Sequence, residues 1–220
     1  MSASHKKIPI LLTLYDRYLD ERDARLFAKA VSRRYTTPTL ERLAQAGDRY
    51  RRRAAVLALG LLADYESNNV LGSALVDADR GVRMLAEHGI RHIWNRAGNQ
   101  YQRKQLAEII RLNDAGEFEK AVERATELLE QAPWFAEIWN QRAVAYFQSG
   151  RFTDSIRDCR QTLEINPYHF GAASGMGRCY LKLDDRISAL ECFRRALRLN
   201  PNLEQVRAQV VYLQKSLKDK

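Results

Sequence analysis

The chain has 220 residues, of which 45% are apolar, so it can build a real core in one elongated array or in two ordinary domains. Pro and Gly number only 5 and 11, a composition that favours helices almost throughout and leaves little room for strands. The formal charge of +9 is mostly N-terminal, with 17 Lys and Arg against 11 Asp and Glu in residues 1–100. Such a charge can steer the protein toward an anionic partner, although solubility alone also accounts for it.

The first predicted element lies within residues 8–34. Apolar side chains such as Leu11, Tyr15, Phe27 and Val31 recur there at helical spacing. This pattern predicts one or two helices that cap the open end of the units that follow.

Several features bear on where the protein resides. Lys6 and Lys7 precede an apolar run that resembles a signal peptide, but Asp16 and Arg17 close the run without a small-residue cleavage site. No stretch approaches the roughly 18 apolar residues of a membrane span. The three cysteines are Cys159, Cys179 and Cys192, an odd number without C-x-x-C spacing. This pattern argues against a disulfide framework or a zinc site and indicates a reducing compartment. We therefore expect a soluble cytoplasmic protein.

A 31-residue period follows, in which four residues recur with the same character: Asp48, Arg52, Ala55 and Leu59 match Asp79, Arg83, Ala86 and Ile90. This segment is similar to HEAT repeats, and two such units would span about residues 37–97. In that family the Asp and Arg residues usually cap helices and pair between adjacent units, so the resemblance implies structural roles for them here. Local cap signals agree with helix boundaries at Thr37-Pro38, Gly47-Asp48 and Gly98-Asn99.

The densest positive cluster lies in the first of these units. Because Arg52 already has a structural explanation, an alternative site for nucleic acid or another polyanion would rest on Arg49, Arg51 and Arg53. Some HEAT-like superhelices do cradle nucleic acid, and binding of that kind depends on phosphate contacts and falls steeply with salt.

Two further patterns resemble parts of known sites, one for a metal ion and one for a phosphate group. His88 and His92 are four residues apart, a spacing able to place two imidazoles on one metal, but no third ligand accompanies them. The glycine-rich run of residues 171–177 is similar to a phosphate loop, yet it falls within a predicted repeat helix with no strand before it. No catalytic set stands out from solvated helix faces. We expect no enzyme activity, no metal and no cofactor.

A second period dominates the C-terminal half, where Pro133, Pro167 and Pro201 are each 34 residues apart. A fixed period in this range marks a stack of helical hairpins. Aligned on the prolines, the repeats span about residues 102–135, 136–169 and 170–203. The residues that fit the repeat pattern are Trp139, Ala143 and Tyr146 in the second copy and Gly177, Tyr180, Ala189, Phe193 and Ala196 in the third. This pattern resembles the tetratricopeptide repeat.

The turns and ends of this array also follow from the sequence. Gly116 and Gly150 stand where the chain must leave a first helix in a left-handed conformation, and Asp184 replaces glycine in the third copy. The first copy is degenerate, because Ile109 occupies its close-approach position. We expect a cap helix over residues 204–218.

In the tetratricopeptide family, first-helix positions at fixed register face the concave side, so the resemblance implies a partner-binding groove. The mapped residues are Arg103, Asn140, Val144, Phe147, Arg178, Leu181 and Lys182, with Leu106, Ile110 and Glu137 on the same predicted face. Members that grip the carboxylate tails of heat-shock chaperones carry a Lys- and Asn-rich set here, from which Leu106, Ile110 and Val144 depart. The lining suits a peptide or helix with apolar anchors and some negative charge.

The sequence thus predicts an all-α solenoid, with a helical cap and HEAT-like repeats in residues 1–98 and a tetratricopeptide array in residues 99–220. The predicted function is a non-enzymatic scaffold or adaptor that binds another protein or peptide. The alternative function is binding of nucleic acid or another polyanion through the basic HEAT-like region.

Overall fold

The computed structural model describes residues 9–218, which form thirteen α-helices, one 3-10 turn and no strand. The prediction of an all-helical fold is confirmed. The chain divides into two compact units, Met1–Ile93 and Trp94–Lys220. Lys6 and Lys7, which bear on the signal-peptide question, lie outside the described residues. None of the described helices combines the length and the apolar character that a membrane crossing requires.

The helices of the first unit follow one another with short connections. They are α1 (Ile10–Glu21), α2 (Ala24–Ser32), α3 (Thr37–Ala46), α4 (Arg49–Leu62), η1 (Tyr65–Ser67), α5 (Asn68–Ala74) and α6 (Arg80–Asn95), the last of which runs two residues past the division between the units. Helices α1 and α2 both contact α4. The starts of α3 and α5 are 31 residues apart, as are those of α4 and α6, so helix positions follow the period seen in the sequence.

Two helices in this unit, α2 and α4, begin at an aspartate whose side chain caps the first turn. The Asp48 carboxylate accepts hydrogen bonds from the backbone N–H groups of Tyr50 and Arg51, each at 3.0 Å, which satisfies two unpaired donors of the first turn of α4. The cap predicted at Thr37 is one residue off, because α3 begins at Thr37 and its N-cap is Thr36.

Two glycines allow α4 and α6 to cross closely. A Cβ placed on Gly60 would lie 2.7 Å from the Cα of Gly89, and one on Gly89 would lie 2.8 Å from the Cα of Gly60. These atoms belong to the backbone and cannot rotate away. The close crossing of α4 and α6 therefore requires a residue without a side chain at both positions.

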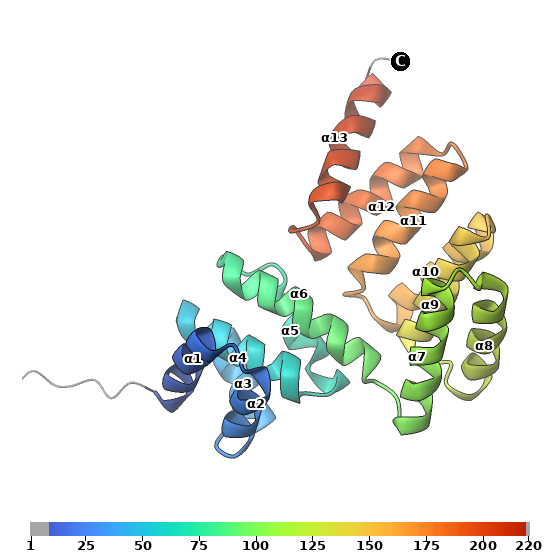
Figure 1. The fold of residues 1–220 in the computed structure, drawn as a ribbon. Coiled ribbons are helices and arrows are strands. Elements are labelled where there is room, and N and C mark those ends of the chain that lie inside the picture. The colour runs from blue at the N-terminus through green and yellow to red at the C-terminus, as the bar shows by residue number, and fades with distance from the viewer. Residues whose placement is uncertain (1–8, 219–220) are drawn as a thin grey trace, which may run out of the picture. The chain divides into compact units, whose positions relative to one another are not determined.

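The second unit consists of three antiparallel hairpins and a final helix (Figure 1). The hairpins are α7 (Gln100–Asp114) with α8 (Phe118–Gln131), α9 (Ala136–Gln148) with α10 (Phe152–Ile165), and α11 (Phe170–Lys182) with α12 (Arg186–Leu199), and they are followed by α13 (Glu204–Lys218). Asn99 and Gln102 form a reciprocal capping box at the start of α7. The glycine-rich run of residues 171–177 lies inside α11, as predicted.

The turns within the hairpins have the predicted conformation. Gly116 and Gly150 each have φ of 77°, and Asp184 has φ of 56° in the equivalent place. Gly177 provides the close approach within the third hairpin, because a Cβ there would lie 2.6 Å from the ring of Phe193. The turn chemistry and the small residue thus position the two helices of that hairpin together.

Large aromatic side chains fill the interior of the second unit. Phe135, Phe170 and Phe193 are each at most 1% exposed. Cys159 and Cys179 are also buried, as free thiols. Burial raises the pKa of the Cys159 thiol to about 12.

Candidate functional site

The first helices of the three hairpins carry the predicted groove residues. Arg103 lies on α7; Asn140, Val144 and Phe147 lie on α9; and Arg178, Leu181 and Lys182 lie on α11. Helix α7 contacts α9, and α9 contacts α11. The first helices of successive hairpins therefore lie next to one another.

Four of the predicted residues line one small hollow between α9, α10 and α11. Asn140, Val144, Phe147 and Arg178 share it with small and polar residues that include Ser155, Cys159 and Gly175, and its volume is about 80 Å³. The Phe147 ring packs at 5.6 Å from that of Phe152. This hollow is too small for a folded partner, but it can receive a single side chain.

A second, larger hollow of about 550 Å³ adjoins the first at Arg178. Its walls are contributed by α11, α12 and α13, and it is lined by Ser174, Arg178, Leu181, Phe193, Asn202, Leu203, Glu204, Gln205, Val206 and Gln209. The lining mixes apolar side chains with amides and one carboxylate. The residues contributed by α13 were not among the predicted set, although the cap helix itself was predicted.

Arg178 lies in both hollows and is exposed. Its guanidinium carbon lies 5.5 Å from the centre of the Phe147 ring, within range of a cation–π contact. Among the described residues, no carboxylate forms an ion pair with it. A positive charge beside an apolar ring is a suitable receptor for an acidic group next to an apolar anchor.

Other predicted positions lie elsewhere. Arg103 and Lys182 are exposed and line neither hollow. Leu106 is 1% exposed and belongs to the core around α7 and α8, so its predicted place on the groove face is wrong. Glu137 is 6% exposed, and its predicted place on that face is also wrong.

Glu137 instead anchors a buried polar network. Its Oε2 lies 3.0 Å from His169 Nε2, and its Oε1 accepts hydrogen bonds from the side-chain amides of Asn140 at 2.9 Å and Gln141 at 2.8 Å. The His169 ring stacks on that of Trp94, with centroids 4.2 Å apart. Burial alone would raise the pKa of the Glu137 carboxyl, but the His169 contact and the two amides bring it below its usual value. Asn140 therefore lines the hollow while it also supports the interior.

His169 Nδ1 accepts a hydrogen bond from the backbone N–H of Ala172 at 3.0 Å. The Nε2 atom is therefore the protonated nitrogen of the neutral ring and donates to Glu137. No sequence pattern pointed to this pair, because Glu137 and His169 lie 32 residues apart, outside the 34-residue register.

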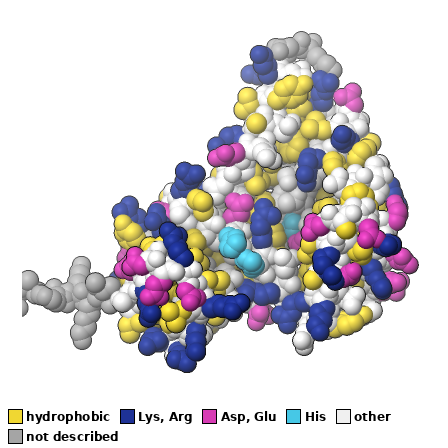
Figure 2. Space-filling view, viewed as in Figure 1, with side chains coloured by type: hydrophobic (Ala, Val, Ile, Leu, Met, Phe, Trp, Pro, Cys, Tyr) yellow, Lys and Arg dark blue, Asp and Glu magenta, His cyan; other side chains and the backbone are white. Residues whose placement is uncertain are grey.

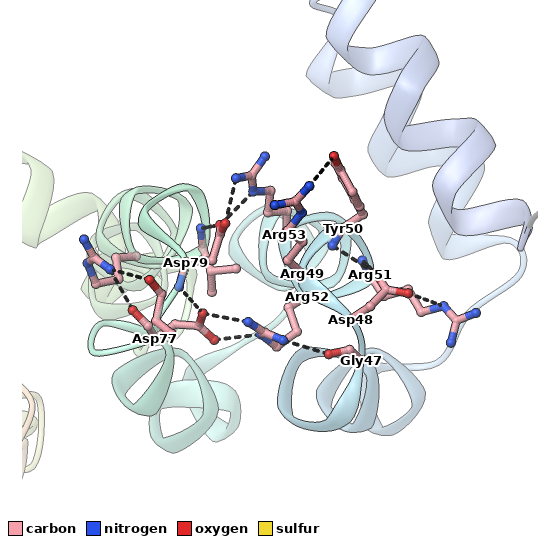
Figure 3. A network of polar contacts seen from close by, with 12 residues as sticks. Gly47, Asp48, Arg49, Tyr50, Arg51, Arg52, Arg53, Asp77 and Asp79 are labelled. Carbon is pink, nitrogen blue, oxygen red and sulfur yellow. Dashed lines mark hydrogen bonds and ion pairs between the residues drawn. The ribbon is translucent and has the colours of Figure 1, made fainter.

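The basic cluster of the first unit is largely engaged within the protein (Figure 3). Arg52 makes two hydrogen bonds to the Asp77 carboxylate, at 2.8 and 2.9 Å, and Arg53 makes two to that of Asp79, both at 2.7 Å. These contacts confirm the structural role predicted for Arg52 and Asp79. They extend that role to Arg53, which belonged to the predicted polyanion patch.

The two other arginines of that patch have weaker partners. Arg51 lies 3.3 Å from Asp48, with 44% of its side chain exposed, and Arg49 donates to the Tyr50 hydroxyl at 3.0 Å. On the face shown in Figure 2, Lys and Arg side chains alternate with Asp and Glu and do not gather into one field. The paired arginines offer less free charge than the sequence suggests.

His88 and His92 lie against each other, with their Nε2 atoms 3.0 Å apart. Within residues 9–218, no group of three or more His, Cys, Asp or Glu side chains is arranged to hold a metal ion.

A stack of antiparallel hairpins whose first helices share a hollowed face defines an α-helical repeat protein. Two segments of the chain, residues 136–169 and 171–203, match models of the tetratricopeptide repeat. A TPR repeat-containing protein of Rhizobium etli is 30% identical over 145 residues, which cover 64% of this chain and 68% of that protein. The chain belongs to the tetratricopeptide repeat family.

Other relatives match over smaller regions. The Hsp70-Hsp90 organizing protein of Triticum aestivum is 29% identical over 94 residues, which are 43% of this chain and only 16% of that protein. Among solved structures, the first TPR of Spaghetti (RPAP3) bound to an HSP90 peptide superposes with a TM-score of 0.52 at 21% identity and covers 55% of this chain and 96% of that one. The last comparison supports the fold of the helical array.

Proposed function

We propose that the chain is a protein-interaction scaffold that holds an extended peptide or a short helix against α9 and α11. The proposed ligand carries an acidic side chain next to an apolar anchor. The observation that carries this proposal is the position of Arg178, which joins the two hollows, faces the Phe147 ring and has no carboxylate partner among the described side chains.

The family supports the general class of ligand. Hairpin stacks present extended surfaces that bind other chains, and the Spaghetti domain is a structural neighbour bound to the HSP90 peptide SRMEEVD. In the present chain Ile110 and Val144 stand where chaperone-binding members are expected to carry polar clamp residues. We therefore propose that apolar anchors contribute more than a terminal carboxylate does.

A display screen with random linear peptides on the whole chain tests this proposal. We expect selected peptides to combine Asp or Glu with Leu, Ile or Phe and to bind more tightly than SRMEEVD. The substitution Arg178→Glu should weaken the best peptide roughly tenfold or more, because it replaces an attraction by a repulsion. The matched control is Arg194→Glu, which makes the same charge change at an exposed position of α12.

The control should bind as the wild type does. Equal loss in both variants would show a general charge effect and would reject a site at Arg178. Selection of peptides without acidic residues would reject the proposed ligand class. Asn140 is unsuitable for this test, because its amide also supports the buried Glu137.

A further inference from the structure

Helix α13 has two unlike faces. Val210 and Leu213 are 8% and 0% exposed and pack in one core cluster with Phe193. On the other face, Val211 and Tyr212 are 61% and 65% exposed. We define the outer stripe of α13 by its exposed residues at three- and four-residue spacing, which share one helix face: Glu204, Arg207, Ala208, Val211, Tyr212 and Lys215.

The outer stripe forms a surface that lacks a covering element among the described residues. All of its members except Lys215 line a shallow hollow of about 480 Å³. Two large side chains, each more than half exposed, lie next to each other with an alanine beside them, and together they form a continuous apolar patch that another surface can cover. The charges at the two ends of the stripe show which partner fits it.

The outer stripe is complementary to itself when a second α13 lies antiparallel to it. Glu204 and Lys215 are equally far from the midpoint between Gln209 and Val210, and so are Ala208 and Val211. In an antiparallel pair of identical helices related by a two-fold axis at that midpoint, residues equally far from it face each other. Each glutamate then meets a lysine, and each alanine meets a valine.

We propose that this face binds a second copy of the same chain, through an antiparallel pairing of two α13 helices. Glu204 pairs with the partner's Lys215, Ala208 packs against the partner's Val211, and the axis makes each contact twice. The small Ala208 side chain allows the two helix backbones to approach closely.

The two remaining stripe residues flank this seam on opposite sides. This two-fold axis places the same flank of both helices on the same side of the seam. Tyr212 therefore lies beside the partner's Tyr212, close to the axis. Arg207 donates a hydrogen bond to the Pro201 carbonyl, which directs its guanidinium away from the axis. The two positive charges are thereby kept apart, and the two tyrosine rings can make contact.

The size of the contact sets the strength of the dimer. A helix of 15 residues is roughly 22 Å long, and one helix pair buries less than the roughly 1,000 Å² expected of a stable interface. We expect a reversible dimer with a Kd on the order of 100 μM, in the range of weak complexes.

Sedimentation equilibrium of the whole chain over roughly 5 μM to 1 mM tests the proposal, since that range brackets the expected Kd. The wild type should pass from monomer to dimer. Val211→Glu should remain monomeric, because each copy would place a carboxylate in the apolar centre of the seam. The matched control is Met84→Glu, the same kind of change at a residue of α6 that is 56% exposed, and it should dimerise as the wild type does.

Charge reversal tests the antiparallel register. Glu204→Lys alone places a lysine opposite the partner's Lys215 twice, and we expect the dimer to weaken roughly 3- to 30-fold. Lys215→Glu alone should weaken it by a similar factor. The double variant with both changes restores each opposite-charge pair and should regain most of the wild-type affinity.

A chain that stays monomeric up to 1 mM would overturn the proposal. A dimer that tolerates Val211→Glu uses a different surface, and a double variant weaker than both single ones contradicts the antiparallel register. Because Glu204 also lines the larger hollow, peptide binding measured in Val211→Glu separates this contact from the proposed groove: that variant should be monomeric and still bind peptide.

Discussion

The two units use the same pair of residue types, an arginine and an aspartate, to join different kinds of segment. In the first unit, Arg52 on α4 binds Asp77 in the segment that leads into α6, with 21% and 14% of their side chains exposed. In the second unit, Arg142 on α9 binds Asp158 on α10 within one hairpin, with 13% and 3% exposed. The first pair is therefore half-buried and joins α4 to the segment before α6, whereas the second is buried and joins the two helices of a single hairpin.

The second pair also shows what a repeat register does and does not determine. Thirty-four residues further on, the positions of Arg142 and Asp158 are occupied by Met176 and Cys192, which pack in the same apolar cluster. The register thus predicts that two side chains meet, but it leaves open whether they meet as an ion pair or as apolar groups. The chain contains both solutions in neighbouring repeats.

The largest effect is expected from breaking the interior pair. Asp158→Ala leaves the Arg142 guanidinium buried without its carboxylate, and should cost about 3–5 kcal/mol of unfolding free energy. Asp77→Ala, at the more exposed pair, should cost about 1–2 kcal/mol. Urea unfolding, with hydrogen exchange to assign each transition to its unit, measures both values.

The neighbouring repeat supplies the matched control. Arg142→Met combined with Asp158→Cys reproduces the third repeat at this joint and should recover most of the lost stability, because no unpaired charge stays buried. If the double variant is as unstable as Asp158→Ala, the ion pair has a specific role that apolar packing cannot replace.

The close helix contacts of the two units should differ in how well they tolerate an added methyl group. Gly60→Ala places a Cβ against the backbone of α6, so we expect a loss of about 2–3 kcal/mol. Gly177→Ala meets the buried Phe193 ring, which can shift slightly, and should cost about 1–2 kcal/mol. Gly175→Ala on the same helix makes only an ordinary contact with Cys159 Sγ at 3.4 Å, and should be neutral or stabilising by up to about 1 kcal/mol. An equal loss in all three variants would reject the steric explanation.

The half-buried Arg–Asp pairs of the first unit should make its stability depend on acid. Hydrogen bonding by Arg53 is the largest cause that lowers the pKa of Asp79, to about 2 in the folded protein. Because the folded value lies below the unfolded one, the stabilisation is complete above about pH 4 and is lost as the pH falls toward 2. Asp79→Asn should reduce the pH dependence of the unfolding free energy over that range, and Arg53→Met should reduce it similarly. A steep slope that persists in both variants would locate the acid sensitivity elsewhere.

The smallest effect is expected for the alternative function, binding of nucleic acid or another polyanion, which remains a prediction. If Arg49 and Arg51 bind phosphates, a titration with duplex and single-stranded DNA and RNA should show affinity that falls with salt, and Arg49→Glu should reduce it. The ion pairs of Arg52 and Arg53 lead us to expect weak binding at most. Tight, salt-dependent binding that is lost in Arg49→Glu would restore the alternative.

The sequence predicted most of the hairpin positions because their determinants are local. Prolines, turn glycines, Asp184 and the caps at Asp48 and Asn99 act within a few residues of the helix ends that they define. The side-chain partners of Arg53 and Glu137 depend on distant residues, Asp79 and His169, which no local pattern connects. Burial also depends on distant residues, so the repeat register places Leu106 and Glu137 on the groove face although both are buried.

The most direct test of the proposed binding site is hydrogen exchange of the whole chain with and without its best selected peptide. The proposal predicts slowed exchange in α9 and α11, around Phe147 and Arg178, and no change in α8 or α4. Protection confined to α8 or α4, with α9 and α11 unaffected by a bound peptide, would contradict it.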